Sequence, residues 1–127
     1  MEKKKKFQTV EDVPVWQKSH ELTLLIYKLT KEYPRDELYG LISQIKRSSS
    51  SIPANITEGF YKNTTKELIQ FLFNARGSCG ETIYHLKLSF DLKYIKEKDY
   101  LFLRKEYENV NMQLNSWMKS LRSRIWH

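Results

Sequence analysis

Six polar or charged residues in the middle of the chain lie beside small side chains and could form either a catalytic pair or a structural network. They are Gln44, Arg47, Asn55, Glu58, Arg76 and Glu81. Acid–base catalysis would use Glu58 and Glu81 as paired carboxylates in an accessible cleft. In the alternative, Arg47 and Arg76 pair with the two glutamates and fix the register of two helices. Because the sequence supplies neither a nucleophile with its base nor a phosphate-binding loop, we expect the network and no enzymatic activity.

The other reactive side chains are isolated from one another. The histidines are too far apart in the sequence to share a helix face, so we expect no metal site and no cofactor. They are His20, His85 and His127. Cys79 is the single cysteine, which excludes an intramolecular disulfide, and its position on an apolar stripe indicates a small buried side chain.

Positive charge is concentrated at the two ends of the chain. The formal net charge is +7, and residues 1–6 and 109–127 each carry a local charge of +3. The basic residues of these ends are Lys3, Lys4, Lys5, Lys6, Lys119, Arg122 and Arg124. They could bind phosphates, or they could solubilise the chain and complement the dipole of the last helix. Of the tryptophans that could stack on bases, Trp117 is expected in the core, whereas Trp16 and Trp126 are ambiguous.

Length and composition predict one packed domain. The chain has 127 residues, of which 40% are hydrophobic. No apolar run approaches the roughly 20 residues of a membrane span, and the lysine-rich start lacks the apolar segment of a signal peptide. We therefore expect a soluble cytoplasmic protein without membrane association.

Apolar residues recur every three or four positions in four stretches, which predicts an all-α protein. The predicted helices span about 14–33, 37–60, 65–94 and 98–124, and a basic flexible segment, 1–12, precedes them. Pro34 should end the first helix, Asp36 should cap the second, and Thr64 with Glu67 should form a capping box for the third. Short connections predict an up-down-up-down four-helix bundle over residues 13–127.

The second predicted helix contains four serines, Ser48–Ser51, followed by Pro53. A proline in a helix interior removes a backbone donor and costs ~3 kcal/mol or more, which would favour a loop. The apolar positions nevertheless keep the same helical phase on both sides of Pro53. A continuous helix kinked at Pro53 explains that phase, whereas a loop does not.

Small residues occupy the middle of the second and third predicted helices. They are Ser48, Ser49, Ser51, Ala54, Ala75, Gly77, Ser78 and Gly80. Each glycine costs ~1 kcal/mol relative to alanine inside a helix, so we expect close packing of the two helices to offset that cost. A chance run of small surface residues is the alternative.

Three segments carry recognisable motifs: VWQKSHEL over Val15–Leu22, GLISQIKRSSSSIPANITEGF over Gly40–Phe60, and FLFNARGSCGE over Phe71–Glu81. With these motifs the chain resembles the four-helix bundle proteins encoded in 23S rRNA intervening sequences. That family includes the accessory variability protein (Avd) of diversity-generating retroelements. The resemblance covers the chain from Val13 to Leu121.

The resemblance implies a ring-like homopentamer with a basic surface for RNA or DNA and, in the retroelement branch only, binding to a reverse transcriptase. Residues that match the family motif, with Arg76 beside them, are interpreted as fold or assembly residues. They are Gln44, Arg47, Ser51, Asn55, Glu58, Gly59, Arg76, Gly77, Ser78 and Glu81. The central helices of this chain are nearly neutral, so a strongly basic binding channel is not evident in the sequence.

Two functions follow from these observations. The first is a non-enzymatic, oligomeric protein that binds nucleic acid through its basic ends, largely without sequence specificity. The second is an oligomeric scaffold for a protein partner such as a reverse transcriptase. Exposed aromatic residues that a lone bundle does not need, Tyr39, Tyr61 and Phe102, favour the second.

Overall fold

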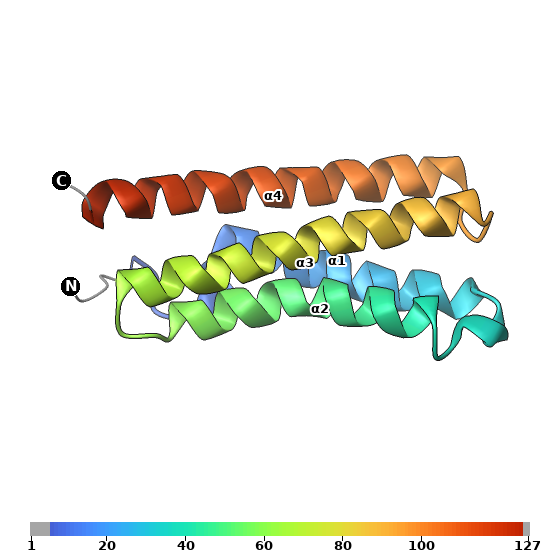
Figure 1. Cartoon of the computed structure of the whole chain (residues 1–127), viewed down its shortest axis with the longest axis horizontal. Helices are drawn as coiled ribbons and strands as arrows, with labels where there is room; N and C mark the ends of the chain where they lie inside the picture. The colour runs from blue at the N-terminus through green and yellow to red at the C-terminus, as the bar shows by residue number, and fades with distance from the viewer. Residues whose placement is uncertain (1–5, 126–127) are drawn as a thin grey trace.

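The computed structural model describes residues 6–125, and four long helices in it form an antiparallel bundle (Figure 1). The helices are α1 (Pro14–Leu29), α2 (Leu41–Phe60), α3 (Thr65–Asp91) and α4 (Glu97–Ile125). Three short 3-10 helices, η1 (Val10–Asp12), η2 (Thr30–Glu32) and η3 (Arg35–Glu37), precede or follow α1. The described residues contain no strand. The predicted all-α, up-down-up-down architecture is therefore confirmed.

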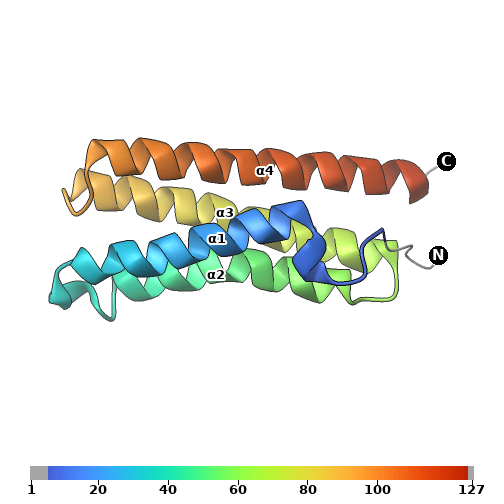
Figure 2. The same cartoon turned by 180° about the vertical axis from the view of Figure 1, so that it is seen from behind.

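Because the number of helices is even, the start of α1 and the end of α4 lie at the same end of the bundle (Figure 2). We call this the terminal end. No helix of the described chain is long and apolar enough to cross a membrane.

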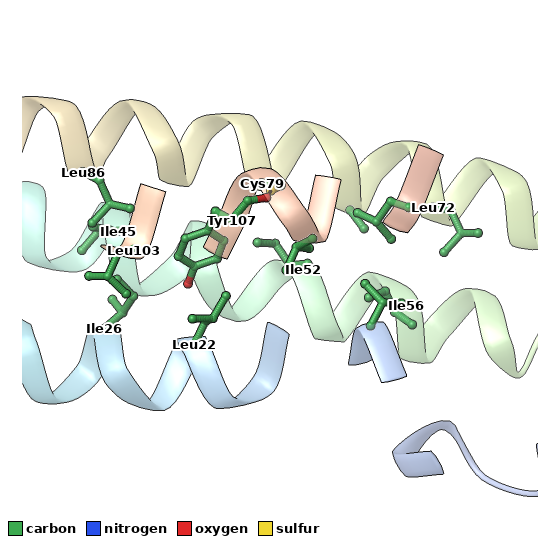
Figure 3. Packing of buried hydrophobic residues seen from close by; sticks show 14 of the residues in the cluster. Leu22, Ile26, Ile45, Ile52, Ile56, Leu72, Cys79, Leu86, Leu103 and Tyr107 are labelled. Atoms are coloured by element: carbon green, nitrogen blue, oxygen red, sulfur yellow. Dashed lines mark hydrogen bonds between the residues drawn. The ribbon is translucent and has the colours of Figure 1, made fainter. Parts of the chain in front are cut away.

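The core is one cluster of buried, mostly aliphatic side chains between the four helices, and Tyr107 is fully buried within it (Figure 3). The helices contribute Leu22 and Ile26, then Ile45, Ile52 and Ile56, then Leu72, Cys79 and Leu86, and finally Leu103 and Tyr107. On α4 the fully buried residue near the end is Met118, at 2% exposed, whereas Trp117 is only partly buried. The expectation that Trp117 belongs to the core is thus only partly met.

The start of α2 differs from the sequence prediction. Asp36 does not cap a helix beginning at 37, because residues 35–37 form η3 and Gly40 has a non-helical backbone, with φ −113° and ψ −111°. Instead, the Glu37 carboxylate accepts a hydrogen bond from the Leu41 backbone N–H at 3.3 Å. Leu38, which precedes this start, is 49% exposed.

Helix α2 continues without a break through Pro53, which is buried. A proline has no N–H to offer the carbonyl one turn earlier, that of Ser49. The Thr23 hydroxyl of α1 lies 3.1 Å from this carbonyl oxygen and 2.8 Å from that of Ser19. A neighbouring helix therefore places a hydroxyl donor beside the carbonyl that Pro53 leaves free, although its one hydrogen is shared with the Ser19 carbonyl. The predicted continuity is confirmed, and the kink stays a prediction.

Both ends of α3 are set by local hydrogen bonds. At its start, the Glu67 backbone N–H donates to Thr64 Oγ1 at 3.2 Å, and that hydroxyl donates to the Glu67 carboxylate at 2.8 Å. At its end, Lys93 adopts a left-handed backbone with φ 67°, and the Tyr94 N–H donates back to the Ser89 carbonyl. This Schellman ending stops the helix at Asp91, three residues before the predicted end.

Part of the predicted N-terminal segment, 1–12, packs against the bundle. Residues 10–12 form η1, and Val10 is 5% exposed within the core cluster. Burial of this apolar side chain attaches η1 to the bundle. Residues 1–5 lie outside the described chain.

Candidate nucleic-acid interface

The family-motif residues of α2 and α3 form one polar seam between these helices. The Arg47 guanidinium donates to the Glu81 carboxylate across the seam and, at 2.9 Å, to Gln44 Oε1. One turn further along, Ser78 Oγ donates to Ser51 Oγ at 3.0 Å. The Asn55 amide donates to the Ser51 carbonyl at 2.8 Å. The predicted Arg47–Glu81 pair is present.

Arg76 and Glu58 do not join this seam, contrary to the prediction. Arg76 lies two residues before Ser78, about 200° around α3, and therefore faces α4. Its Nη1 donates to Asn115 Oδ1 at 2.9 Å. Glu58 is exposed and forms no salt bridge within residues 6–125. Glu81 pairs with Arg47 and lies next to His85, so the two glutamates share no partner among residues 6–125.

A histidine that the sequence analysis set aside does belong to the seam. His85 Nε2 lies 3.3 Å from the Glu81 carboxylate, one helical turn away on α3. The sequence signal for this contact is a glutamate four residues before a histidine on one helix. Within the described chain no group of three or more His, Cys, Asp or Glu residues could hold a metal ion.

Cys79 is fully buried between α3 and α4, as predicted, and its thiol donates to the Tyr107 carbonyl oxygen at 3.2 Å. Burial raises the pKa of the Cys79 thiol to about 12. The thiolate that reacts with alkylating agents is therefore scarce at neutral pH, and the agent has no access.

We expect iodoacetamide at pH 8 to alkylate Cys79 of the folded protein at least about 100-fold more slowly than Cys79 of the protein in denaturant. Mass spectrometry after timed quenching measures this directly, because the single cysteine allows one adduct. Equal rates in the two states would contradict the burial of Cys79.

The small residues of α2 and α3 have two different environments. Ser48 and Thr82 are buried against each other, with their hydroxyl oxygens 2.9 Å apart. A Cβ added at Gly59 would lie 2.9 Å from Phe71 Cβ, so the helices approach closely there. At Gly77 and Gly80, however, a Cβ would meet nothing within 4 Å. The predicted close packing holds for the serines and is wrong for these two glycines, whereas Gly59, for which it was not predicted, packs closely.

Arg76 also forms part of a basic surface on α3 and α4 at the terminal end. The Arg76 and Arg122 guanidinium carbons lie 4.8 and 4.7 Å from the centroid of the Phe73 ring. Lys119 is exposed on the same flank of α4, one turn from Arg122. We call the group of Phe73, Arg76, Asn115, Lys119 and Arg122 the arginine face.

No acidic residue occurs in the segments of α3 and α4 that carry this face, 68–80 and 109–125. Neither Arg76 nor Arg122 has a carboxylate partner among the described residues. The positive charge of the arginine face is therefore not neutralised by the fold.

Arg124 lies on another flank of α4, where it meets the start of the chain. With Lys6 it lines a pocket of about 450 Å³ between residues 6–7, the start of α1 and the last turns of α4, which we call the terminal pocket. The fold thus brings one basic residue from each end of the sequence to the same pocket. The other predicted basic residues of the N-terminus, Lys3, Lys4 and Lys5, lie outside the described residues, as do Trp126 and His127.

A second, shallower groove of about 360 Å³ lies between α1 and α2. Its wall includes Trp16, whose indole N–H donates to Thr57 Oγ1 at 2.9 Å and whose ring stacks on His20. Leu24 and Tyr27 at its edge are exposed. The predicted exposed aromatic residues Tyr39, Tyr61 and Phe102 are indeed exposed.

Comparison with known proteins agrees with this architecture. A protein of unknown function of the S23 ribosomal protein family from Bacteroides thetaiotaomicron has a similar structure, with a TM-score of 0.78 and 29% sequence identity. The similarity covers 87% of this chain and 99% of the other. No curated protein matches the sequence. The model of the family described as 23S rRNA-intervening sequence protein matches residues 11–116. The chain therefore belongs to the 23S rRNA-intervening sequence protein family.

Proposed function

We propose that the protein is a non-enzymatic nucleic-acid-binding protein that holds phosphates on the arginine face. The observation that carries this proposal is the pair of arginines on Phe73 with no carboxylate partner among the described residues. Turnover that depends on Glu58 or Glu81 would contradict the non-enzymatic part of the proposal.

The arginine face holds two like charges near one another. Both guanidinium groups lie within 4.8 Å of one ring centroid, so they are within about one Debye length of each other at 0.1 M salt. Their repulsion is unfavourable for the free protein. A phosphate between them would offset it with charge-assisted hydrogen bonds.

The geometry favours binding without sequence specificity. Arginine and lysine contacts to phosphates position a nucleic acid but do not read bases. Five described cations belong to the arginine face or the terminal pocket: Lys6, Arg76, Lys119, Arg122 and Arg124. This number is enough for salt-sensitive binding to a phosphate backbone.

A salt series tests the proposal. We expect the association constant for a 20-base-pair DNA duplex or an RNA hairpin to fall with salt, with a log–log slope of about −3 to −4 for the duplex. Fluorescence anisotropy of labelled probes measures it between low salt and 0.2 M. The absence of binding even at the lowest salt would contradict a nucleic-acid role and leave the charge as a solubilising feature.

A second candidate function is an oligomeric scaffold for a protein partner, such as a reverse transcriptase. The exposed glycines Gly77 and Gly80 favour it, because each weakens α3 and neither is needed for packing within the bundle. A second chain could approach the helix closely at these positions. The pentamer and the link to retroelement accessory proteins come from the family resemblance. Light scattering that gives a 15.3 kDa monomer would contradict the oligomer.

A further inference from the structure

We propose that the terminal pocket takes one unpaired nucleotide of a bound single-stranded nucleic acid, with its base inside the pocket and its phosphate toward Lys6 and Arg124. This inference rests on the proposed function and names a site in addition to the arginine face. It assigns to the pocket the recognition of a base, which phosphate contacts alone do not provide.

The pocket has the size and lining of a small-molecule site. Its volume of about 450 Å³ lies in the range of roughly 300–1,000 Å³ that is usual for ligand pockets. Its apolar wall comes from several elements and includes Val15, Phe60 and Leu121. Such a wall suits the flat apolar faces of a nucleobase.

Aromatic groups in the pocket match the flat face of a base, and polar groups match its hydrogen-bonding edge. Trp117 is partly buried and offers its ring for stacking, which is sequence-tolerant because every base has a π face. Along the same flank of α4, Gln113, Ser116 and Ser120 line the pocket at one-turn spacing. An amide and two hydroxyls can donate to and accept from the edge of a base.

These polar groups have hydrogen-bonding capacity that the fold does not use. Within residues 6–125 no hydrogen bond joins the Ser116 or Ser120 hydroxyl to another residue, whereas Ser48, Ser49 and Ser123 donate to carbonyl groups of their own helices. The Trp117 indole N–H likewise has no acceptor there, whereas that of Trp16 donates to Thr57.

Charge complementarity selects an anionic ligand. Lys6 and Arg124 line the pocket, and none of its described lining residues is acidic. Lys6 also lies 5.5 Å from the centroid of the Phe7 ring, so its charge is next to an aromatic wall. An uncharged apolar ligand would leave both cations without a partner.

The test compares a decauridylate RNA with a ten-residue abasic oligonucleotide, which carries the same phosphates and no bases. We expect the wild-type protein to bind decauridylate about tenfold more tightly at equal salt. Ser120→Phe should fill the pocket and abolish this preference while keeping the affinity for the abasic oligonucleotide. Ser123→Phe, the same change on α4 outside the pocket, should keep the preference.

The outcomes distinguish failure of the pocket from failure of the proposed function. Equal affinity of the wild-type protein for the two oligonucleotides would overturn the pocket and leave the proposed nucleic-acid role intact. Loss of the preference in both phenylalanine variants, with circular dichroism unchanged, would also overturn it, because the base contact would lie elsewhere. Failure of both oligonucleotides to bind at low salt would overturn the proposed function itself.

Discussion

Replacing Arg76 and Arg122 together by glutamine is expected to weaken binding to a 20-base-pair DNA duplex by about 50-fold near 0.1 M salt. Each cation that neutralises a duplex phosphate contributes about 0.9 to the salt slope, which corresponds to about eightfold in affinity at 0.1 M. The slope itself should become less steep by about 2. Fluorescence anisotropy across the salt series measures both quantities in one experiment.

The structure offers a control that removes the same amount of charge elsewhere. Lys96 is exposed just before α4 and Lys98 in its first turn, at the opposite end of the bundle. Neither has a salt-bridge partner in the described chain. The Lys96→Gln and Lys98→Gln double variant should bind less than about threefold more weakly, because only the general field of the protein changes. Equal weakening by the two double variants would contradict a binding site on the arginine face.

Glutamine is chosen so that the packing on Phe73 is disturbed little. A cation over an exposed ring is worth roughly 0.5–1 kcal/mol, so the double variant should remain folded. A thermal unfolding curve close to that of the wild-type protein would confirm that a loss of affinity reflects the missing charges.

The helices themselves could be predicted because their stability comes from burying one apolar stripe each. The stripe of α2 keeps its phase through Pro53, and the core residues Ile52 and Ile56 lie where that phase places them. What the sequence did not indicate was the partner of the freed carbonyl, since Thr23 lies on another helix. Long-range hydrogen bonds of this kind depend on the three-dimensional register of two helices.

The helix ends were less predictable because several residues near each end compete to form the cap. Asp36 is a better cap by type than Glu37, but the backbone at Gly40 moved the start of α2 to a place that only Glu37 reaches. At the end of α3, a lysine adopts the left-handed conformation that usually signals glycine or asparagine. Residue type alone predicts neither the cap of α2 nor the end of α3.

For the candidate site, composition indicated which charges matter but not how they are grouped. The meeting of Lys6 and Arg124 follows from an even number of antiparallel helices, so it could have been deduced from the predicted topology. The grouping of Arg76 with Arg122 could not, because it depends on which flank of α3 faces α4. Pairing Arg76 with a glutamate assumed the wrong flank.

Gly59→Ala should lower the free energy of unfolding by about 1–3 kcal/mol, the usual cost of overpacking a core. The added methyl group would lie 2.9 Å from Phe71 Cβ and 3.2 Å from the Leu68 carbonyl oxygen, and both belong to the start of α3. Neither atom is the end of a flexible side chain, so the two helices must separate. Urea denaturation followed by circular dichroism measures the effect.

Gly80→Ala provides the matched control, because it is the same substitution in a helix with open space around the new methyl group. It should raise the free energy of unfolding of a monomer by about 0.5–1 kcal/mol through the higher helix propensity of alanine. If Gly59→Ala had the same free energy of unfolding as the wild-type protein, this would contradict the close approach of α2 and α3.

The same control variant discriminates between the two candidate functions. If a second chain packs closely on α3 at Gly80, the alanine should reduce the average mass measured by light scattering while each chain stays folded. If the arginine face is the only functional surface, the mass and the affinity for nucleic acid should both equal those of the wild-type protein. A glycine that costs ~1 kcal/mol in an exposed helix then remains without a packing role, which argues for testing Gly77→Ala in the same way.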